Sequence, residues 1–142
     1  QNQTDALTHD ITSIEDYKSP YIGNASNTGN LFWNLPLNNV DMKFEINLET
    51  CALTVNYLDT VWNIGEEKVQ CDLVYNSVAA MAAIDNLSGI TYNFSGESYF
   101  FSRKQIEEVF GSPLSELLEQ EKWNKEVQDK LNSTDFVEQF FS

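Results

Sequence analysis

The chain has 142 residues and a formal net charge of −14, which comes from 22 acidic and 8 basic residues. This length is typical of one domain, and 42% apolar and 13% aromatic residues are enough to build a buried core. The acidic excess disfavours nucleic acids and anionic membrane surfaces as direct partners, because binding them requires clustered lysine and arginine side chains. A well-hydrated, soluble exterior is the simplest reason for such a charge.

The beginning of the chain is polar. We predict a flexible segment at residues 1–13, a helical turn near Ile11–Tyr17 and a single folded domain at residues 14–142. The sequence does not begin with Met, and it contains no apolar run of the ~18–20 residues that cross a bilayer. We therefore expect contact with a membrane only through an N-terminal anchor that has been removed.

The stretch Tyr17–Leu37 combines turn signals with a short helical pattern. Pro20 and Gly23 favour a turn, and Pro36 ends the helical pattern because proline cannot continue a helix. We predict that the apolar stripe of this helix faces the core and that the segment covers the sheet. The stripe contains Thr28, Leu31, Phe32 and Leu35.

Alternating apolar residues at Phe44–Leu73 predict three antiparallel strands. In the predicted register, one hairpin pairs Leu53 with Val69 and Cys51 with Cys71. This pairing brings the two cysteines close enough for a disulfide bond, which would stabilise the fold by roughly 3 kcal/mol. The bond would indicate an oxidising, extracytoplasmic location. Two buried free thiols, which are common in cytosolic proteins, are the alternative.

The second half of the chain predicts two more strands between helices. An alanine-rich pattern at Val78–Ile84 indicates a helix. The alternation at Ile90–Phe94 and Tyr99–Phe101 indicates two strands, and the turn residues Ser95–Gly96 join them.

The C-terminal region predicts several helices. Ser102 begins one that ends at Gly111, Ser112 begins another whose apolar stripe changes phase near Gln120–Asn124, and Thr134 begins a last short helix. The change of phase predicts a bend. Taken together, the elements predict an α+β domain, with a single antiparallel sheet of about five strands, helices packed on one face and a helical C-terminus.

Few residues are suited to catalysis or metal binding. His9 is the only histidine, and we expect it to be exposed in the polar N-terminal segment rather than fixed beside a nucleophile. The chain lacks the set of Cys and His ligands that a zinc site needs. Acidic pairs such as Glu66–Glu67 and Glu107–Glu108 are expected to be solvated. We therefore predict no catalytic residue, no metal ligand and no cofactor.

Aromatic residues outside the predicted core stripes are the candidates for partner binding. Trp62 and Ile64 fall in a predicted loop, where apolar side chains are hard to bury. Trp33 points about 100° away from its neighbour Phe32 on the core stripe, and Tyr21 lies in the preceding turn. Exposed Trp and Tyr are favoured at binding surfaces because they combine a large area with a polar group. The alternative is that the C-terminal helices cover these side chains.

Four sequence blocks carry a resemblance to a known family. They are YKSPYIGNASNTGNLFWNLPL at Tyr17–Leu37, CALTVNY at Cys51–Tyr57, AAIDNLSGITYNF at Ala82–Phe94 and YFFSRKQIEEVFG at Tyr99–Gly111. In this order they resemble the bacterial domain-of-unknown-function family 4825. The resemblance implies an extracytoplasmic domain of Gram-positive bacteria, often in a lipoprotein and sometimes attached to a membrane sensor. It implies no catalytic residue, and Cys51 departs from the family's pattern, so the disulfide bond would be particular to this chain.

These observations favour a non-enzymatic domain, anchored at the cell surface or secreted, that binds a protein or a small-molecule ligand as a sensor or accessory module. The alternative is a carboxylate-dependent hydrolase of cell-wall or glycan material. That activity requires a cleft with two carboxyl groups about 5–10 Å apart. A structural spacer, the third hypothesis, would have neither a concave site nor an aromatic patch.

Overall fold

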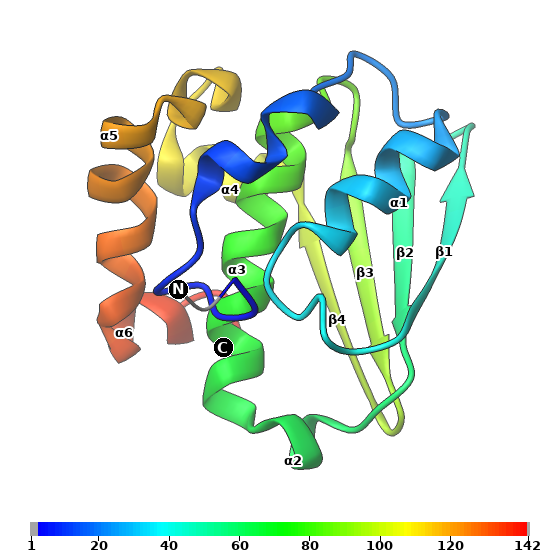
Figure 1. The fold of residues 1–142 in the computed structure, drawn as a ribbon, viewed down its shortest axis with the longest axis vertical. Coiled ribbons are helices and arrows are strands. Elements are labelled where there is room, and N and C mark those ends of the chain that lie inside the picture. Colours follow the sequence, from blue (N-terminus) through cyan, green and yellow to red (C-terminus); the bar gives the residue numbers. More distant parts are fainter. Residues whose placement is uncertain (1–2, 142) are drawn as a thin grey trace.

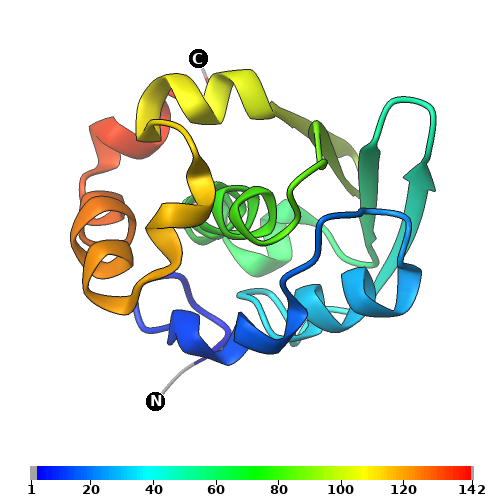
Figure 2. The same cartoon turned by 90° about the horizontal axis from the view of Figure 1, so that it is seen from above.

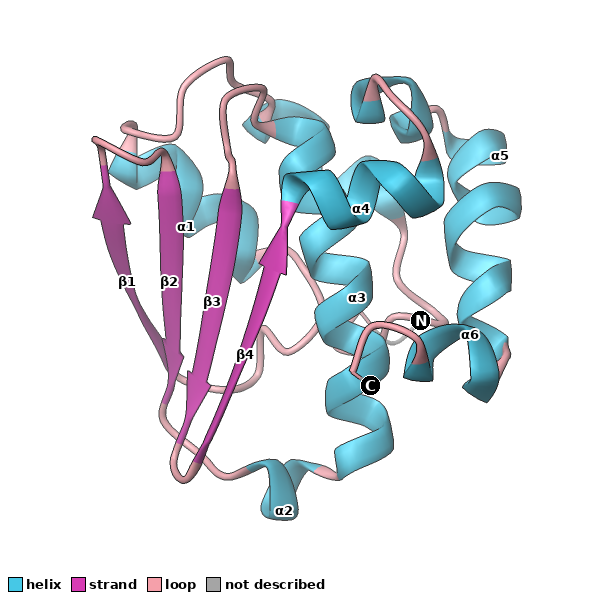
Figure 3. Ribbon diagram, turned by 180° about the vertical axis from the view of Figure 1, so that it is seen from behind, coloured by secondary structure: helices cyan, strands magenta, loops and turns pink. Residues whose placement is uncertain are grey.

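Helices cover one face of a four-stranded sheet and leave its other face open to solvent, as Figure 1 and Figure 2 show from two directions. The computed structural model describes residues 3–141. Viewed from behind in Figure 3, the strands lie in front of helix α1, and helices α3 to α6 lie beyond the β4 edge. The α+β class predicted from the sequence is therefore confirmed.

The sheet is mixed rather than antiparallel. Its strands follow the order β1-β2-β3-β4, with antiparallel pairing of β1 with β2 and of β3 with β4, but parallel pairing of β2 with β3. The prediction of about five antiparallel strands was thus wrong in number and in direction at the centre. The strands are β1 (Met42–Asn47), β2 (Ala52–Tyr57), β3 (Gly89–Phe94) and β4 (Glu97–Ser102).

A long helix replaces the predicted third strand. The short helix α2 (Val61–Ile64) and the long helix α3 (Glu66–Ala83) connect β2 to β3, as a parallel pair of strands requires. From Val69 onward α3 is buried on nearly every side, so its sequence lacks the polar face that marks a surface helix. Its buried polar groups find partners within the fold: for example, Nδ2 of Asn76 donates to the Pro36 carbonyl at 2.9 Å.

Most of the remaining elements agree with the sequence-based prediction. Ser102 caps α4, because its hydroxyl accepts the Gln105 N–H at 3.1 Å, and Gly111 ends that helix with a φ of 92°. The predicted bend corresponds to a π-helical turn, η3. The other elements are the 3-10 helices η1 (Ile11–Tyr17), η2 (Leu114–Leu118) and η4 (Asp129–Asn132), the π-helix η3 (Asn124–Gln128), and α1 (Ala25–Trp33), α4 (Arg103–Phe110), α5 (Gln120–Trp123) and α6 (Thr134–Glu138).

The N-terminal segment packs against α3 in the structure. The Ala6 N–H donates to Asp72 Oδ1 at 2.8 Å, and Lys68 Nζ donates both to the Thr4 carbonyl and to Asp72 Oδ2 at 2.7 Å. The Asp72 side chain has no exposed surface. The predicted mobility of residues 1–13 stays a prediction, and its first two residues lie outside the described part of the chain.

The open face of the sheet carries a polar ladder across all of its strands. Asn56 Nδ2 donates to Glu45 Oε2 at 2.8 Å, and Asn93 Nδ2 donates to Asn56 Oδ1 at 2.9 Å. The Ser98 hydroxyl completes the ladder by donating to Asn93 Oδ1. Such a face needs no helix to cover it.

Among residues 3–141, no helix is both long enough and apolar enough to cross a membrane.

Candidate functional site

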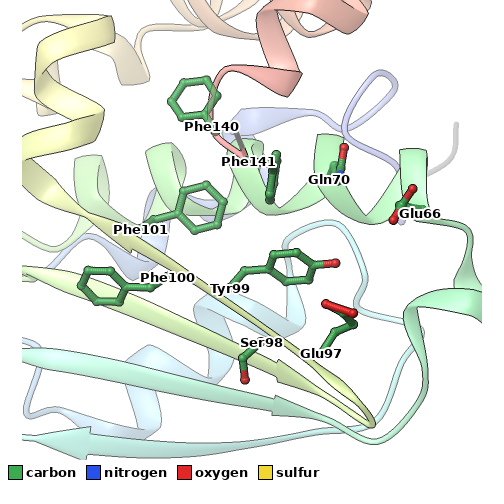
Figure 4. A pocket seen from close by; sticks show the side chains of 9 residues that line it. All are labelled: Glu66, Gln70, Glu97, Ser98, Tyr99, Phe100, Phe101, Phe140 and Phe141. Atoms are coloured by element: carbon green, nitrogen blue, oxygen red, sulfur yellow. The ribbon is translucent and has the colours of Figure 1, made fainter.

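An open groove of about 450 Å³ lies between strand β4, the N-terminal half of α3 and the end of the described chain (Figure 4). In this groove, aromatic rings and charged groups of separate elements come together. No lysine or arginine belongs to its lining. The lining residues are Glu66, Gln70, Glu97, Ser98, Tyr99, Phe100, Phe101, Phe140 and Phe141.

Aromatic side chains form the floor of the groove. Alternation along β4 turns Tyr99 and Phe101 toward the helices. The Phe141 ring stands across both of them, with its centroid 5.4 Å from that of Tyr99 and 5.6 Å from that of Phe101, at interplanar angles of 90° and 83°. Edge-to-face contacts of this kind are favourable. Phe101 is buried, whereas Tyr99 and Phe141 keep part of their surface open to the groove.

Two carboxylates stand at one end of this floor. Glu66 is the first residue of α3, and Glu97 is the first residue of β4. Figure 4 shows the Tyr99 hydroxyl pointing toward this end of the groove. Burial raises the pKa of Tyr99, and the negative charges of Glu97 and then Glu66 raise it further, as expected for carboxylates that lie close to the hydroxyl.

The two carboxylates are available to a ligand. Both side chains are exposed, and none of the ion pairs formed among residues 3–141 includes Glu66 or Glu97. The position of Glu66 also has a structural use, since an acidic residue in the first turn stabilises a helix through its dipole. The position of Glu97 is not explained in this way, because strand β4 has no comparable dipole.

The groove combines the features that bind an organic cation. Aromatic ring faces attract cations, and the carboxylates supply the opposite charge. In contrast, the described residues contain no group of three or more His, Cys, Asp or Glu side chains arranged to hold a metal ion. The aromatic rings and the two carboxylates suit an ammonium or guanidinium group.

The residues predicted as partner contacts lie elsewhere. Trp62, Tyr21 and Trp33 are 92%, 51% and 42% exposed, whereas Ile64 packs partly against the core. None of them lines the groove. Figure 1 places α2, which carries Trp62, at the opposite end of the molecule from the segment before α1, so these residues do not form one surface. Their role in binding stays a prediction.

The sequence pattern does not predict the groove, because Val69–Leu73 alternates like a strand although it lies in the first half of α3. The sequence predicts that Tyr99 and Phe101 share one face of a strand, and it predicts a C-terminal helix that carries phenylalanines. The aromatic residues of the floor therefore lie in elements that the sequence predicts. The proximity of Glu66 to Glu97, however, depends on the path of α3, which the sequence pattern does not predict. One sequence feature could have indicated the groove. Strand β4 has more aromatic residues than one buried face of a strand needs.

His9 is buried, contrary to its predicted exposure. Only 2% of it is accessible, and its Nε2 lies 2.6 Å from the Asn34 carbonyl. Because a carbonyl only accepts, Nε2 carries the proton and Nδ1 accepts from the Tyr75 hydroxyl at 2.6 Å. Burial lowers the pKa of His9, although the Asn34 carbonyl and the charge of Asp10 oppose this shift. The imidazole is thus a structural hydrogen-bonding group.

The two cysteines are free, so the predicted disulfide bond is absent. The proposed register was wrong because Cys71 lies on α3 rather than on a strand opposite Cys51. Each sulfur has other neighbours: Cys51 Sγ lies 3.9 Å from the Leu48 carbonyl, and Cys71 Sγ lies 3.9 Å from the Leu131 carbonyl. Burial, followed by the charge of Asp72, raises the pKa of Cys71 to about 12, so this thiol is a poor nucleophile.

Comparison with known proteins gives one finding. The family model described as "Domain of unknown function (DUF4825)" matches residues 14–106. Searches of curated proteins and of solved structures found no match. The matched range includes the four strands and helix α3, and therefore the Glu66 and Glu97 sides of the groove. The C-terminal phenylalanines lie outside it. On this match over most of its length, the chain belongs to the DUF4825 family.

Proposed function

We propose that this domain is a non-enzymatic binding module whose groove holds a positively charged group of its ligand. The observation that carries the proposal is the placement of Glu66 and Glu97 at one end of an aromatic groove that contains no lysine or arginine. A cation at this end lies beside both carboxylates and against the ring of Tyr99. A guanidinium group fits best, because its plane stacks on aromatic rings while its N–H groups reach carboxylates.

The expected affinity for an isolated cation is modest. An exposed ion pair contributes about 0.2–1 kcal/mol, and an exposed cation–π contact contributes about 0.5–1 kcal/mol. Two such ion pairs and one such contact sum to roughly 1–3 kcal/mol, which corresponds to a dissociation constant of roughly 10–200 mM for a single arginine side chain. Tighter binding requires further contacts from a larger ligand.

The test is a heteronuclear NMR titration with N-acetylarginine amide, compared with N-acetylcitrulline amide, which has the same shape without the charge. We expect the arginine probe to shift the amide signals of Glu97, Phe101 and Phe141, and we expect the shifts to shrink at high salt. The double variant Glu66→Gln/Glu97→Gln should bind at least about fivefold more weakly. The control, Glu108→Gln/Glu121→Gln, makes the same charge change at exposed sites outside the groove. Equal shifts with both probes, or equal losses in both variants, would contradict the proposal.

An extracytoplasmic location is part of the proposal, with the domain at the cell surface as part of a lipoprotein or of a membrane-anchored sensor. Its support is the resemblance described above and the family membership, and the free cysteines add none. Protease treatment of intact cells, followed by immunodetection of the domain, tests it. Complete protection of the domain until the cells are broken would reject the location.

A hydrolase that uses two carboxylates is the second candidate, because Glu66 and Glu97 line one groove. Burial of one carboxyl group is what gives such an enzyme its proton donor near neutral pH. Both of these side chains are exposed, which favours binding of a cation over acid catalysis. Release of reducing sugars from cell-wall glycan by the intact protein, abolished in Glu97→Gln, would establish the hydrolase instead.

A further inference from the structure

The free edge of β4 borders the groove and exposes unpaired main-chain groups. The register pairs Tyr99 with Tyr92, and the Arg103 N–H donates to the Ser88 carbonyl at 2.8 Å in the same ladder. Hydrogen-bonded pairs alternate along an antiparallel ladder, so residues 97, 99, 101 and 103 bond toward β3. The N–H and C=O groups of Ser98 and Phe100 therefore point away from the sheet. Within residues 3–141, no other element forms a backbone hydrogen bond with them.

The two edges of the sheet differ in their protection. Strand β1 carries Lys43 and Glu45 along its open face, and charged residues on an edge strand discourage the addition of another strand. Strand β4 has a charge only at its first residue, Glu97, and between this residue and Ser102 it reads Ser-Tyr-Phe-Phe. Phe100 is 61% exposed. The β4 edge thus has the composition of a strand that accepts a neighbour.

The groove lies where alternate side chains of an added strand would fall. A new strand runs about 4.8 Å from β4, and every second side chain points to the same face as Tyr99 and Phe101. The residue opposite Phe101 lies against the aromatic part of the groove at Phe141, which is partly exposed, whereas Phe140 is buried behind it. The residue opposite Tyr99 enters the end that holds Glu66 and Glu97. One extended segment therefore places one apolar and one basic side chain in the groove.

We propose that the β4 edge binds an extended basic segment of a partner protein as an additional antiparallel strand. Antiparallel pairing is slightly more stable per residue than parallel pairing, and it sets the order of the side chains. Read from its N-terminus, the segment has an apolar residue opposite Phe101, any residue opposite Phe100, and an arginine or lysine opposite Tyr99. The recognised pattern is apolar–x–basic, and the inference rests on the proposed cation-binding function of the groove.

Charge selects this occupant over a second copy of the chain. Each copy has a net charge of −14, so pairing of two β4 edges would bring together two strongly acidic molecules with Glu97 near the contact. A basic segment reverses the sign of that interaction and accelerates the encounter. Main-chain hydrogen bonds supply affinity in this mode of recognition, and the side chains in the groove supply specificity.

Backbone methylation of a peptide provides the test. The probe is a dye-labelled octapeptide with Val and Arg two positions apart in a Ser/Thr background, measured by fluorescence anisotropy. The residue between Val and Arg lies opposite Phe100, so its N–H pairs with β4, whereas the Arg N–H points away. N-methylation at the intermediate residue should weaken binding at least about fivefold, and N-methylation at Arg should have little effect. Equal binding of the two methylated peptides would overturn the inference.

A protein variant tests the same contact from the other side. Ser98→Pro removes an N–H that faces the open edge, at a position where an edge strand tolerates proline. Ser98→Ala is its matched control, because it removes only the hydroxyl bonded to Asn93. We expect Ser98→Pro to lose peptide binding at least about fivefold while Ser98→Ala retains it. Circular dichroism confirms that both variants are folded.

The outcomes separate this inference from the proposed function. If N-acetylarginine amide binds and the peptide binds no more tightly, strand addition is wrong and the cation site stands. If neither probe binds, the cation site itself is wrong. If sedimentation shows a dimer that Ser98→Pro abolishes, the edge belongs to a second copy and the partner segment is rejected.

Discussion

The Tyr75 hydroxyl donates a hydrogen bond to Nδ1 of His9 over 2.6 Å inside the core. The two residues are 66 positions apart, and their rings meet edge-to-face with centroids 5.2 Å apart. This bond fixes a polar residue of the N-terminal segment to the long central helix. Burial, rather than this bond, favours the neutral imidazole, because it lowers the pKa of His9.

The first prediction concerns the pH dependence that His9 causes. Its pKa is lower in the folded protein than the ordinary value of 6.5, mainly because of burial. The unfolded chain therefore binds a proton more readily, and His9 contributes stability above pH 6.5 that is lost as the pH falls below it. Urea unfolding between pH 5 and 7 should show a steeper loss of unfolding free energy in the wild type than in His9→Gln. Parallel pH profiles would contradict this account.

Asp72 gives a second pH dependence of opposite sign. Burial raises the pKa of Asp72 to about 6, although the hydrogen bond and charge of Lys68 oppose the shift. The folded state then binds the proton more readily than the unfolded state, so this contribution to stability is full below pH 3.8 and is lost as the pH rises through about 6. Asp72→Asn keeps an acceptor for the Ala6 N–H and removes the titration. Relative to the wild type, Asp72→Asn should therefore be more stable at pH 7 than at pH 4. The difference in unfolding free energy between variant and wild type should shift by on the order of 2 kcal/mol between these two pH values.

The reverse trend with pH would contradict this account. If Asp72→Asn destabilises the protein more at pH 7 than at pH 4, the Lys68 ion pair outweighs burial and the direction given for Asp72 is wrong. Asp129→Asn, an exposed residue on η4, is the control for the loss of one negative charge.

Trp62 and Trp123 should respond differently to substitution. Trp62 is 92% exposed, whereas Trp123 is fully buried with its ring centroid 5.1 Å from that of Tyr75. Trp62→Ala should change the unfolding free energy by less than about 0.5 kcal/mol, and Trp123→Ala should cost about 3–5 kcal/mol or prevent folding. Trp123→Phe provides a milder variant. In the wild type, iodide quenching should remove the fluorescence of Trp62 first, and its full protection would contradict the exposure.

Arg103 should stabilise the end of α3 through the shape of its guanidinium group. Its Nη2 donates to the carbonyls of Met81 and Ile84 at 2.8 and 2.9 Å, and its Nε donates to the Leu87 carbonyl at 2.7 Å. Lysine has one nitrogen in place of this fork, so Arg103→Lys should lower the unfolding free energy by about 1–3 kcal/mol despite the retained charge. Lys104→Gln, on an exposed neighbour, should change it by less than about 0.5 kcal/mol. Equal effects of the two substitutions would show that charge, not geometry, matters.

Sequence patterns predicted the β3–β4 hairpin and the cap of α4 correctly, because those features depend on neighbours in the chain. The turn at Ser95–Gly96 and the cap at Ser102 are local, and both are present. The central helix escaped prediction because it is buried on nearly every side, and Val69, Cys71 and Leu73 happen to alternate with polar residues. Asp72 and Gln70 interrupt the apolar pattern, yet Asp72 is buried through partners from the N-terminal segment.

The environments of His9 and of the candidate site could not be predicted from the sequence. The burial of His9 depends on Asn34 and Tyr75, which are distant in the chain and form no recognisable motif with it. Glu66 looked like an ordinary solvated residue, and only the path of α3 brings it to the groove that Glu97 shares. The role of a surface carboxylate such as Glu66 depends on the elements that the fold places beside it.

The parallel pairing of β2 with β3 has a consequence for how the protein folds. Hairpins β1–β2 and β3–β4 each join neighbours in the chain, whereas the seam between them joins Val55 to Tyr92 and must wait for α3 to cross over. Contacts that close long loops form slowly, so the seam is expected to limit the folding rate. We therefore expect the two hairpins to form before β2 pairs with β3. Substitutions at the β2–β3 seam should change the folding rate more than substitutions in either hairpin turn.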